Sequence, residues 1–146
     1  MSDSQPNPSI VSEHDEKVFT FAKGIPGFSE ITSYTYVQQI SPFSILQSVE
    51  QSDISFILLD PFSYFQQYEV EIPEDVIDEL GITNEEKVVV RNIVSWNKVP
   101  QHRTVNLVAP IIFNLDTMRA KQIILQNTDY TIRHPLQPAK SEGDEG

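Results

Sequence analysis

The sequence predicts an all-β domain, an antiparallel β-barrel-like or sandwich fold with one short helix at about residues 73–80. Two observations predict it: many short segments are rich in β-branched and aromatic residues, and only one segment has a helical period. The chain has 146 residues, and 39% of them are hydrophobic, which suffices for one compact core. The predicted strands are residues 18–22, 34–40, 44–49, 54–59, 87–96, 104–108, 111–114, 122–126 and 130–133.

Turn residues separate these segments. Val18 to Ala22 alternates apolar and polar residues, and Gly24-Ile25-Pro26-Gly27 then turns the chain. Pro42 ends the second predicted strand, and the polar run from Glu50 to Asp53 joins the third to the fourth. Short strands joined by such turns are typical of antiparallel sheets.

The single helical segment carries both end signals. Pro73 suits the first helical position, Glu74 and Asp75 follow in the first turn, and Gly81 can end the helix. Its apolar side would hold Val76, Ile77 and Leu80, and its outer side Asp78 and Glu79.

The ends of the chain differ from its body. Residues 1–16 carry prolines, serines and acids without periodicity and are predicted to be a disordered leader. Residues 17–136 form one predicted domain, and residues 137–146 are predicted to be a disordered acidic tail. With no cysteine, no signal peptide and no apolar run long enough to cross a bilayer, we expect a cytoplasmic protein.

The charge is strongly negative and unevenly placed. Ten Lys and Arg against 21 Asp and Glu give a formal net charge of −11. Residues 69–86 contain acids and no base, whereas bases dominate from Lys87 to Lys140. On charge alone, acidity that only maintains solubility is the simpler explanation; the alternative is oriented docking of a basic partner. Direct binding of nucleic acid or of an anionic membrane is disfavoured in either case.

The sequence shows no pattern typical of an enzyme. None of the three His has a second ligand at metal spacing, and no G-x-S-x-G motif is present. Gly24 to Gly27 lacks the Lys and the further glycines of a phosphate loop. We therefore expect no catalysis, no cofactor and no small-molecule substrate. An acid/base pair of carboxylates stays open as an alternative, because acids are abundant.

The candidate partner-binding residues lie around the start of the acidic segment. Acids in a polar stretch form a solvated or docking surface, and the aromatic residues just before them either add apolar contacts or pack in the core. The candidates are Tyr64, Tyr68, Glu69, Glu71, Glu74, Asp75, Asp78 and Glu79.

Several short motifs occur in a characteristic order. Gly24-Ile25-Pro26-Gly27-Phe28 follows the first strand, and Pro42-Phe43, Asp60-Pro61 and Tyr68-Glu69 come next. The later half has the runs from Val105 to Ile111, from Gln122 to Leu125 and from Arg133 to Leu136. In this order and spacing, the chain resembles the FliW family of flagellar assembly factors from about residue 18 to residue 136.

The resemblance implies a regulatory protein-binding function. FliW-like proteins bind the dimeric RNA-binding translational repressor CsrA and relieve repression of flagellin mRNA translation. They also bind flagellin, which competes with the repressor. Two alternatives remain: a secretion-type chaperone whose only client is flagellin, and a small acid/base hydrolase.

Overall fold

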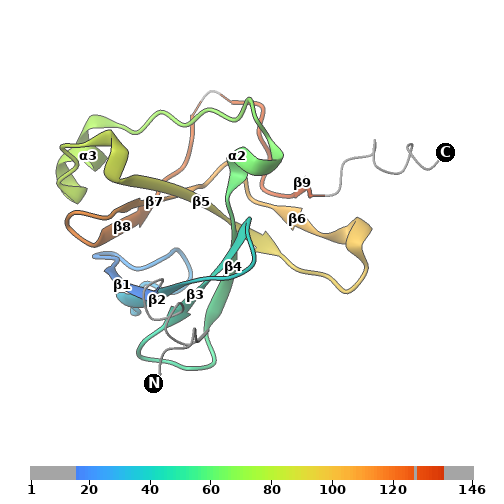
Figure 1. The fold of residues 1–146 in the computed structure, drawn as a ribbon, viewed down its shortest axis with the longest axis horizontal. Helices are drawn as coiled ribbons and strands as arrows, with labels where there is room; N and C mark the ends of the chain where they lie inside the picture. The colour runs from blue at the N-terminus through green and yellow to red at the C-terminus, as the bar shows by residue number, and fades with distance from the viewer. Residues whose placement is uncertain (1–15, 127, 137–146) are drawn as a thin grey trace, which may run out of the picture.

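The structure, a computed structural model, describes residues 16–126 and 128–136 of the chain. Its strands form a closed barrel (Figure 1), which confirms the predicted all-β, barrel-like fold. The predicted acidic tail and residues 1–15 of the predicted leader lie outside the described residues. Glu16, which the prediction placed in the leader, pairs with Val37 in the first strand.

The first four strands form an antiparallel meander in chain order. They are β1 (Glu16–Thr20), β2 (Ser33–Gln38), β3 (Phe43–Ser48) and β4 (Ser55–Leu59). In β3, Ser44, Leu46 and Ser48 are buried and alternate with half-exposed residues. Because successive side chains of a strand point to opposite faces, this alternation turns one face of the meander inward.

The long strand β5 (Val88–Ser95) closes the barrel. Its second half pairs with β4, and its first half pairs with β7 (Ile111–Asn114). β8 (Arg119–Gln122) pairs with β7 and meets β1 in parallel through Thr20 and Arg119, which completes a seven-stranded ring. Two further short strands, β6 (Thr104–Val105) and β9 (His134–Pro135), extend the sheet beside the last residues of β5.

The helices are short and lie outside the barrel (Figure 1). α3 (Glu74–Leu80) matches the predicted helix, although Pro73 precedes it as the N-cap residue and is not its first helical residue. Beyond the one helix expected, the chain forms α2 (Pro61–Tyr64) and the 3-10 turns η2 (Glu85–Lys87) and η3 (Pro100–His102). α2 forms because the Asp60 side chain accepts a hydrogen bond from the Phe62 N–H at 3.1 Å and Pro61 starts the turn.

The predicted strands of the last third are only partly correct. The segment 104–108 is a strand only as far as Val105, because the Asn106 side chain accepts hydrogen bonds from the N–H groups of Val108 and Ala109 and turns the chain. The predicted strand at residues 130–133 is wrong: the ladder forms at His134–Pro135 instead. The predicted strand at 122–126 is largely wrong as well: it overlaps β8 only at Gln122, where β8 ends, and residues 123–126 are not in a strand.

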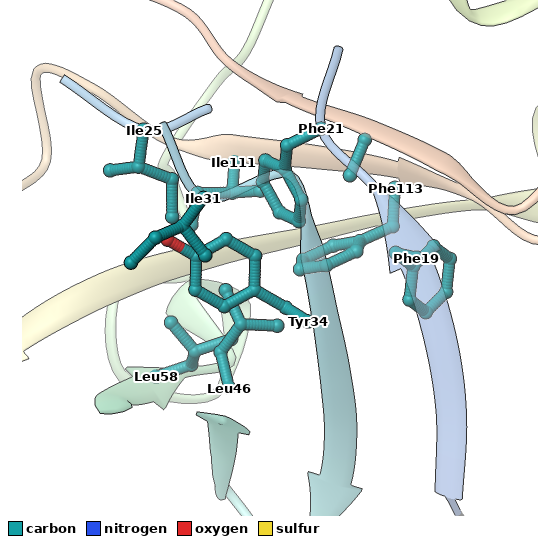
Figure 2. Close-up of a cluster of buried hydrophobic side chains, with 10 residues drawn as sticks. Phe19, Phe21, Ile25, Ile31, Tyr34, Leu46, Leu58, Ile111 and Phe113 are labelled. Atoms are coloured by element: carbon teal, nitrogen blue, oxygen red, sulfur yellow. The ribbon is translucent and has the colours of Figure 1, made fainter. Parts of the chain in front are cut away.

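Buried aromatic and aliphatic side chains pack together in one core cluster (Figure 2). The Phe19 and Phe113 rings lie 4.8 Å apart, and the Phe21 and Tyr34 rings lie 5.0 Å apart, both in edge-to-face geometry. All four side chains are almost fully buried. Edge-to-face pairs of buried rings add stability beyond the burial of their apolar area. A second buried cluster, around Leu59, Tyr68 and Val105, joins the barrel to the segment after α2.

Candidate functional site

Three acids form the exposed side of α3. Glu74, Asp75 and Asp78 all face solvent, whereas Val76 and Leu80 are buried against β7 and the residues after β8. The helical period explains the division, because residues three and four positions apart share a side of the helix. α3 ends in a left-handed Gly81, whose N–H donates to the Asp78 carbonyl.

Glu79 differs from the other acids of α3, because it contacts the barrel and does not face out as predicted. Its carboxylate lies 3.0 Å from the Lys121 ammonium group on β8. Arg119, also on β8, donates a hydrogen bond to the Glu79 carbonyl at 3.0 Å. Two bases of β8 therefore offset negative charge at the last turn of α3. The acids of α3 that stay exposed are Glu74, Asp75 and Asp78.

The residues before α3 form one wall of an acid-lined groove. Residues 69–73 run without regular secondary structure along residues 124–126 and 128–130, and the groove between the two segments has a volume of about 900 Å³. Glu69, Glu71 and Glu74 are exposed on one wall, and no Lys or Arg lines the groove among the described residues. Apolar atoms come from Val70, Ile72, Ile124 and Leu125. Such a groove favours an apolar segment flanked by basic residues.

Tyr68, a predicted partner-binding residue, is buried with 4% of its surface exposed. Its hydroxyl donates to the Leu107 carbonyl at 2.7 Å and accepts from the Asn92 side-chain amide at 3.1 Å. Burial raises the pKa of Tyr68 to about 12, and the Asn92 hydrogen bond only partly offsets this effect. In this conformation Tyr68 supports the wall of the site and presents almost no surface to a partner.

Tyr64 lies in a neighbouring hollow that continues the groove. It is exposed and lines a depression of about 510 Å³ together with Phe65, Leu107, Tyr130 and His134. Tyr130 lines both this hollow and the acid-lined groove, so the two form one continuous surface. The Tyr130 hydroxyl also accepts a hydrogen bond from the Glu69 N–H at 3.1 Å, which fixes the junction between them.

Ile124 and Tyr130 are site residues that the sequence prediction missed. Ile124 is 63% exposed, although it directly follows the buried Ile123. Ile124 belongs to the run from Gln122 to Leu125, but no local pattern marks either residue as part of a binding surface, and both are distant in sequence from the acids that they face. Only the folded chain brings residues 69–74 close to residues 124–126 and 128–130.

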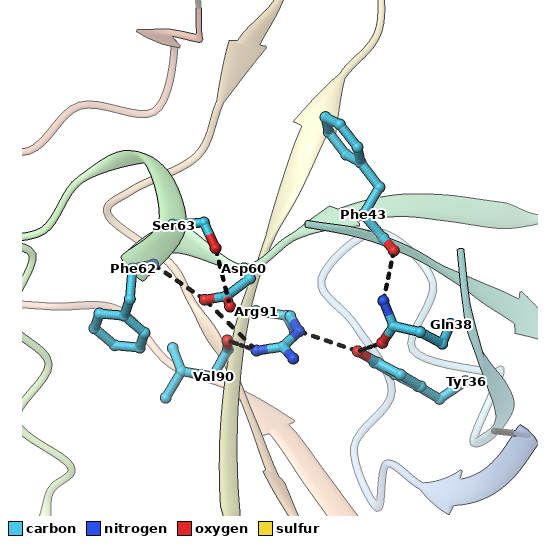
Figure 3. A network of polar contacts seen from close by, with 8 residues as sticks. All are labelled: Tyr36, Gln38, Phe43, Asp60, Phe62, Ser63, Val90 and Arg91. Carbon is cyan, nitrogen blue, oxygen red and sulfur yellow. Dashed lines mark hydrogen bonds and ion pairs between the residues drawn. The ribbon is translucent and has the colours of Figure 1, made fainter. Parts of the chain in front are cut away.

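A polar network at the other side of β5 was also missed (Figure 3). Arg91 Nε donates to the Tyr36 hydroxyl at 3.0 Å, and Tyr36 in turn donates to the Gln38 side-chain oxygen at 3.3 Å. The Arg91 Nη1 lies 3.9 Å from Asp60 Oδ1. The network joins β5 to β2 and to the cap of α2.

The described residues contain no group of three or more His, Asp or Glu positioned to hold a metal ion. Among them, no helix is long and apolar enough to span a membrane.

The fold and this surface define a class: a small closed β-barrel domain with an acidic groove on its outside. The family model described as "FliW protein" matches residues 7–136. The flagellar assembly factor FliW of Clostridium novyi (strain NT) is 41% identical over 129 residues, which cover 87% of this chain and 90% of the relative. That of Bacillus subtilis (strain 168) is 37% identical and covers 84% and 87%.

A solved structure is similar as well. The crystal structure of a flagellar assembly factor FliW superposes with a TM-score of 0.80 at 39% sequence identity, covering 88% of this chain and 89% of that one. The chain belongs to the FliW family.

Proposed function

We propose that this chain acts in the cytoplasm as a non-catalytic flagellar assembly factor that binds two proteins. It binds a dimeric CsrA-type translational repressor and thereby relieves repression of flagellin mRNA translation. It also binds flagellin, which competes with the repressor. The family of the chain supports a role in flagellar assembly, and its surface supports binding without chemistry.

The observation that carries the proposal is the acid-lined groove that continues into the Tyr64 hollow. An RNA-binding repressor presents basic residues, which an acidic surface attracts, while the same surface repels RNA. The proposed contact residues are Tyr64, Glu69, Glu71, Glu74, Asp75, Asp78 and Glu79. Tyr68 leaves this set because its side chain is buried.

A competition experiment tests the proposal. The full-length chain is immobilised, and the repressor and flagellin are offered separately and then together. We expect each to bind alone and flagellin to displace the repressor when both are present. Binding of flagellin without any binding of the repressor would favour a dedicated flagellin chaperone, and binding of neither would contradict the proposal.

Charge reversal tests the surface. The triple variant Glu71→Lys, Asp75→Lys, Asp78→Lys changes three exposed acids of the groove wall and α3. We expect its dissociation constant for the repressor to rise at least about tenfold, because three favourable contacts become repulsive. Titration calorimetry on the folded variant measures the change.

The matched control reverses three exposed acids elsewhere, with Glu30→Lys, Glu50→Lys and Asp53→Lys. Glu30 follows β1, and Glu50 and Asp53 lie in the turn between β3 and β4. Because both triple variants change the net charge equally, a local contact surface predicts a loss only in the first. Equal losses in both would show that net charge, and not the groove, determines binding.

A further inference from the structure

The barrel has a second pocket, of opposite charge, where its wall is incomplete. β8 reaches β1 only at Thr20, and β4 pairs only with the second half of β5. Among the described strands, residues 16–19 of β1 and 88–91 of β5 therefore each have a strand neighbour on one side only. A pocket of about 220 Å³ opens between them.

The floor of this pocket is apolar and its rim is cationic. The floor consists of four apolar side chains: Phe19, Val89, Phe113 and Leu115. The charged residues that line it are Lys17 and Arg91, and no Asp or Glu lines it among the described residues. In a chain with 21 acids and 10 bases, a pocket whose charged lining residues are both bases has a charge opposite to that of the whole chain.

Arg91 is held in place and keeps donor capacity. Its Nε donates to the Tyr36 hydroxyl and its Nη1 to the Val90 carbonyl at 2.8 Å, and a guanidinium has more N–H donors than these two contacts use. Within the described part of the chain, Arg91 makes no further hydrogen bond. Its side chain is 20% exposed, so a ligand can reach it.

The nearest carboxylate, that of Asp60, only partly neutralises the positive charge of the Arg91 guanidinium. Asp60 Oδ1 lies 3.9 Å from Arg91 Nη1, which is beyond hydrogen-bond distance. The Asp60 carboxylate accepts instead from the Phe62 N–H at 3.1 Å and from the Ser63 hydroxyl at 3.3 Å, both at the start of α2 (Figure 3). A guanidinium fixed in this way is suited to receive another carboxylate.

We propose that this pocket binds a carboxylate carried on a small apolar or aromatic body. The carboxylate contacts Arg91, with the Tyr36 hydroxyl and Lys17 beside it, and the apolar body lies on Val89 and Leu115, the lining residues whose apolar side chains are partly exposed. A volume of about 220 Å³ is below that of sites for drug-sized ligands, which begin at about 300 Å³, so it suits one side chain or a small acid. The site is independent of the acidic groove.

The test is an NMR titration of the isotope-labelled full-length protein at millimolar probe concentrations. One pair of probes is 3-phenylpropionate and its amide, and the second is a tetrapeptide ending in Phe with a free or an amidated carboxyl terminus. We expect at least one acid to shift the resonances of Tyr36, Val89 and Leu115, and its amide to bind at least about tenfold more weakly. Binding of the small acid alone indicates a free metabolite-sized ligand, and binding of the peptide alone indicates a chain terminus.

Variants identify the group that recognises the carboxylate. Arg91→Gln should weaken binding of the acid at least about tenfold, whereas Lys98→Gln, an exposed base outside the pocket, should leave it unchanged. If Arg91→Gln does not fold, Lys17→Glu keeps the test decisive, since it reverses charge at an exposed position of the rim. Equal binding of acid and amide, absence of shifts at the pocket, or unchanged binding by both pocket variants would overturn the proposal.

Discussion

The Tyr68 hydroxyl joins three segments that are far apart in the sequence. It donates to the carbonyl of Leu107 and accepts from the side chain of Asn92, which itself donates to the carbonyl of Asn106 at 2.8 Å. The Tyr68 ring packs against Tyr130 with centroids 4.8 Å apart. This single side chain therefore supports both the groove and the turn at Asn106. We expect Tyr68 to affect partner binding only indirectly, by stabilising the fold around the groove.

Tyr68→Phe should lower the free energy of unfolding by about 1–3 kcal/mol, because it leaves the buried Leu107 carbonyl without a partner and removes one of the two acceptors of the Asn92 amide. The matched control is Tyr64→Phe, which removes an exposed hydroxyl and should change stability by less than about 0.5 kcal/mol. Urea denaturation measures both. Equal effects of the two variants would contradict the structural role of Tyr68.

The raised pKa of Tyr68 predicts how this difference depends on pH. The folded pKa is about 12 against about 10 for an unfolded Tyr, so folding favours the neutral hydroxyl. The stability that the hydroxyl contributes is fully present below pH 10 and is lost as the pH rises from about 10 to about 12. The difference between the natural chain and Tyr68→Phe should thus be constant up to about pH 10 and shrink above it. Denaturation curves at neutral pH and at about pH 11 test this, and a constant difference would contradict it.

At the scale of elements, the first half of the fold follows from local patterns and the last third does not. β2 and β3 largely alternate in polarity and β4 is an apolar run, and short turns join β2 to β3 and β3 to β4, so these strands are visible in their own residues. β8 ends at Gln122 because Pro110, opposite the next residues, has no N–H to continue the ladder. Residues 130–133 have strand-like composition, but the turn at Asn106 diverts the strand that would pair with them.

The same contrast holds for the sites. The acidic segment is contiguous, so its charge is readable from the sequence, and α3 could be placed from Pro73 and Gly81. The facing wall with Ile124 and Tyr130, and the pocket around Arg91, depend on contacts across the barrel that no local pattern encodes. The burial of Tyr68 could not be predicted for the same reason.

Gly81→Ala should lower the free energy of unfolding by about 1–2 kcal/mol. Gly81 ends α3 with φ +66°, a left-handed conformation that a Cβ disfavours, and an added Cβ would lie 3.2 Å from Thr117 Cγ2. Gly81→Asn is the control, since Asn tolerates this conformation better and should cost less if backbone strain dominates. Thermal denaturation ranks the three proteins. A larger loss for Asn than for Ala would show that crowding against Thr117, and not strain, limits this position.

At the scale of the whole molecule, opposite charges are placed on different surfaces. Several bases of the later half are engaged by the fold: Arg119 and Lys121 contact Glu79, and the Arg103 guanidinium lies 3.7 Å above the Trp96 ring. The acids of α3 and of the groove wall remain exposed. The field that a distant partner meets is therefore negative at the groove, whereas the cationic pocket acts only at short range.

This arrangement predicts that association with the repressor depends on salt and that dissociation hardly does. Electrostatic attraction acts over about 30 Å at 0.01 M ionic strength but only about 8 Å at 0.15 M. Stopped-flow mixing at these two ionic strengths should show association slowing at least about tenfold from low to high salt, with a nearly constant dissociation rate.

Tyr64→Ala should show the opposite pattern, faster dissociation with little change in association, because Tyr64 is an exposed ring at the end of the groove. A thermal melt of that variant checks that its fold is intact. An association rate indifferent to salt would exclude steering by the acidic surface, whatever Tyr64 contributes to the lifetime of the complex.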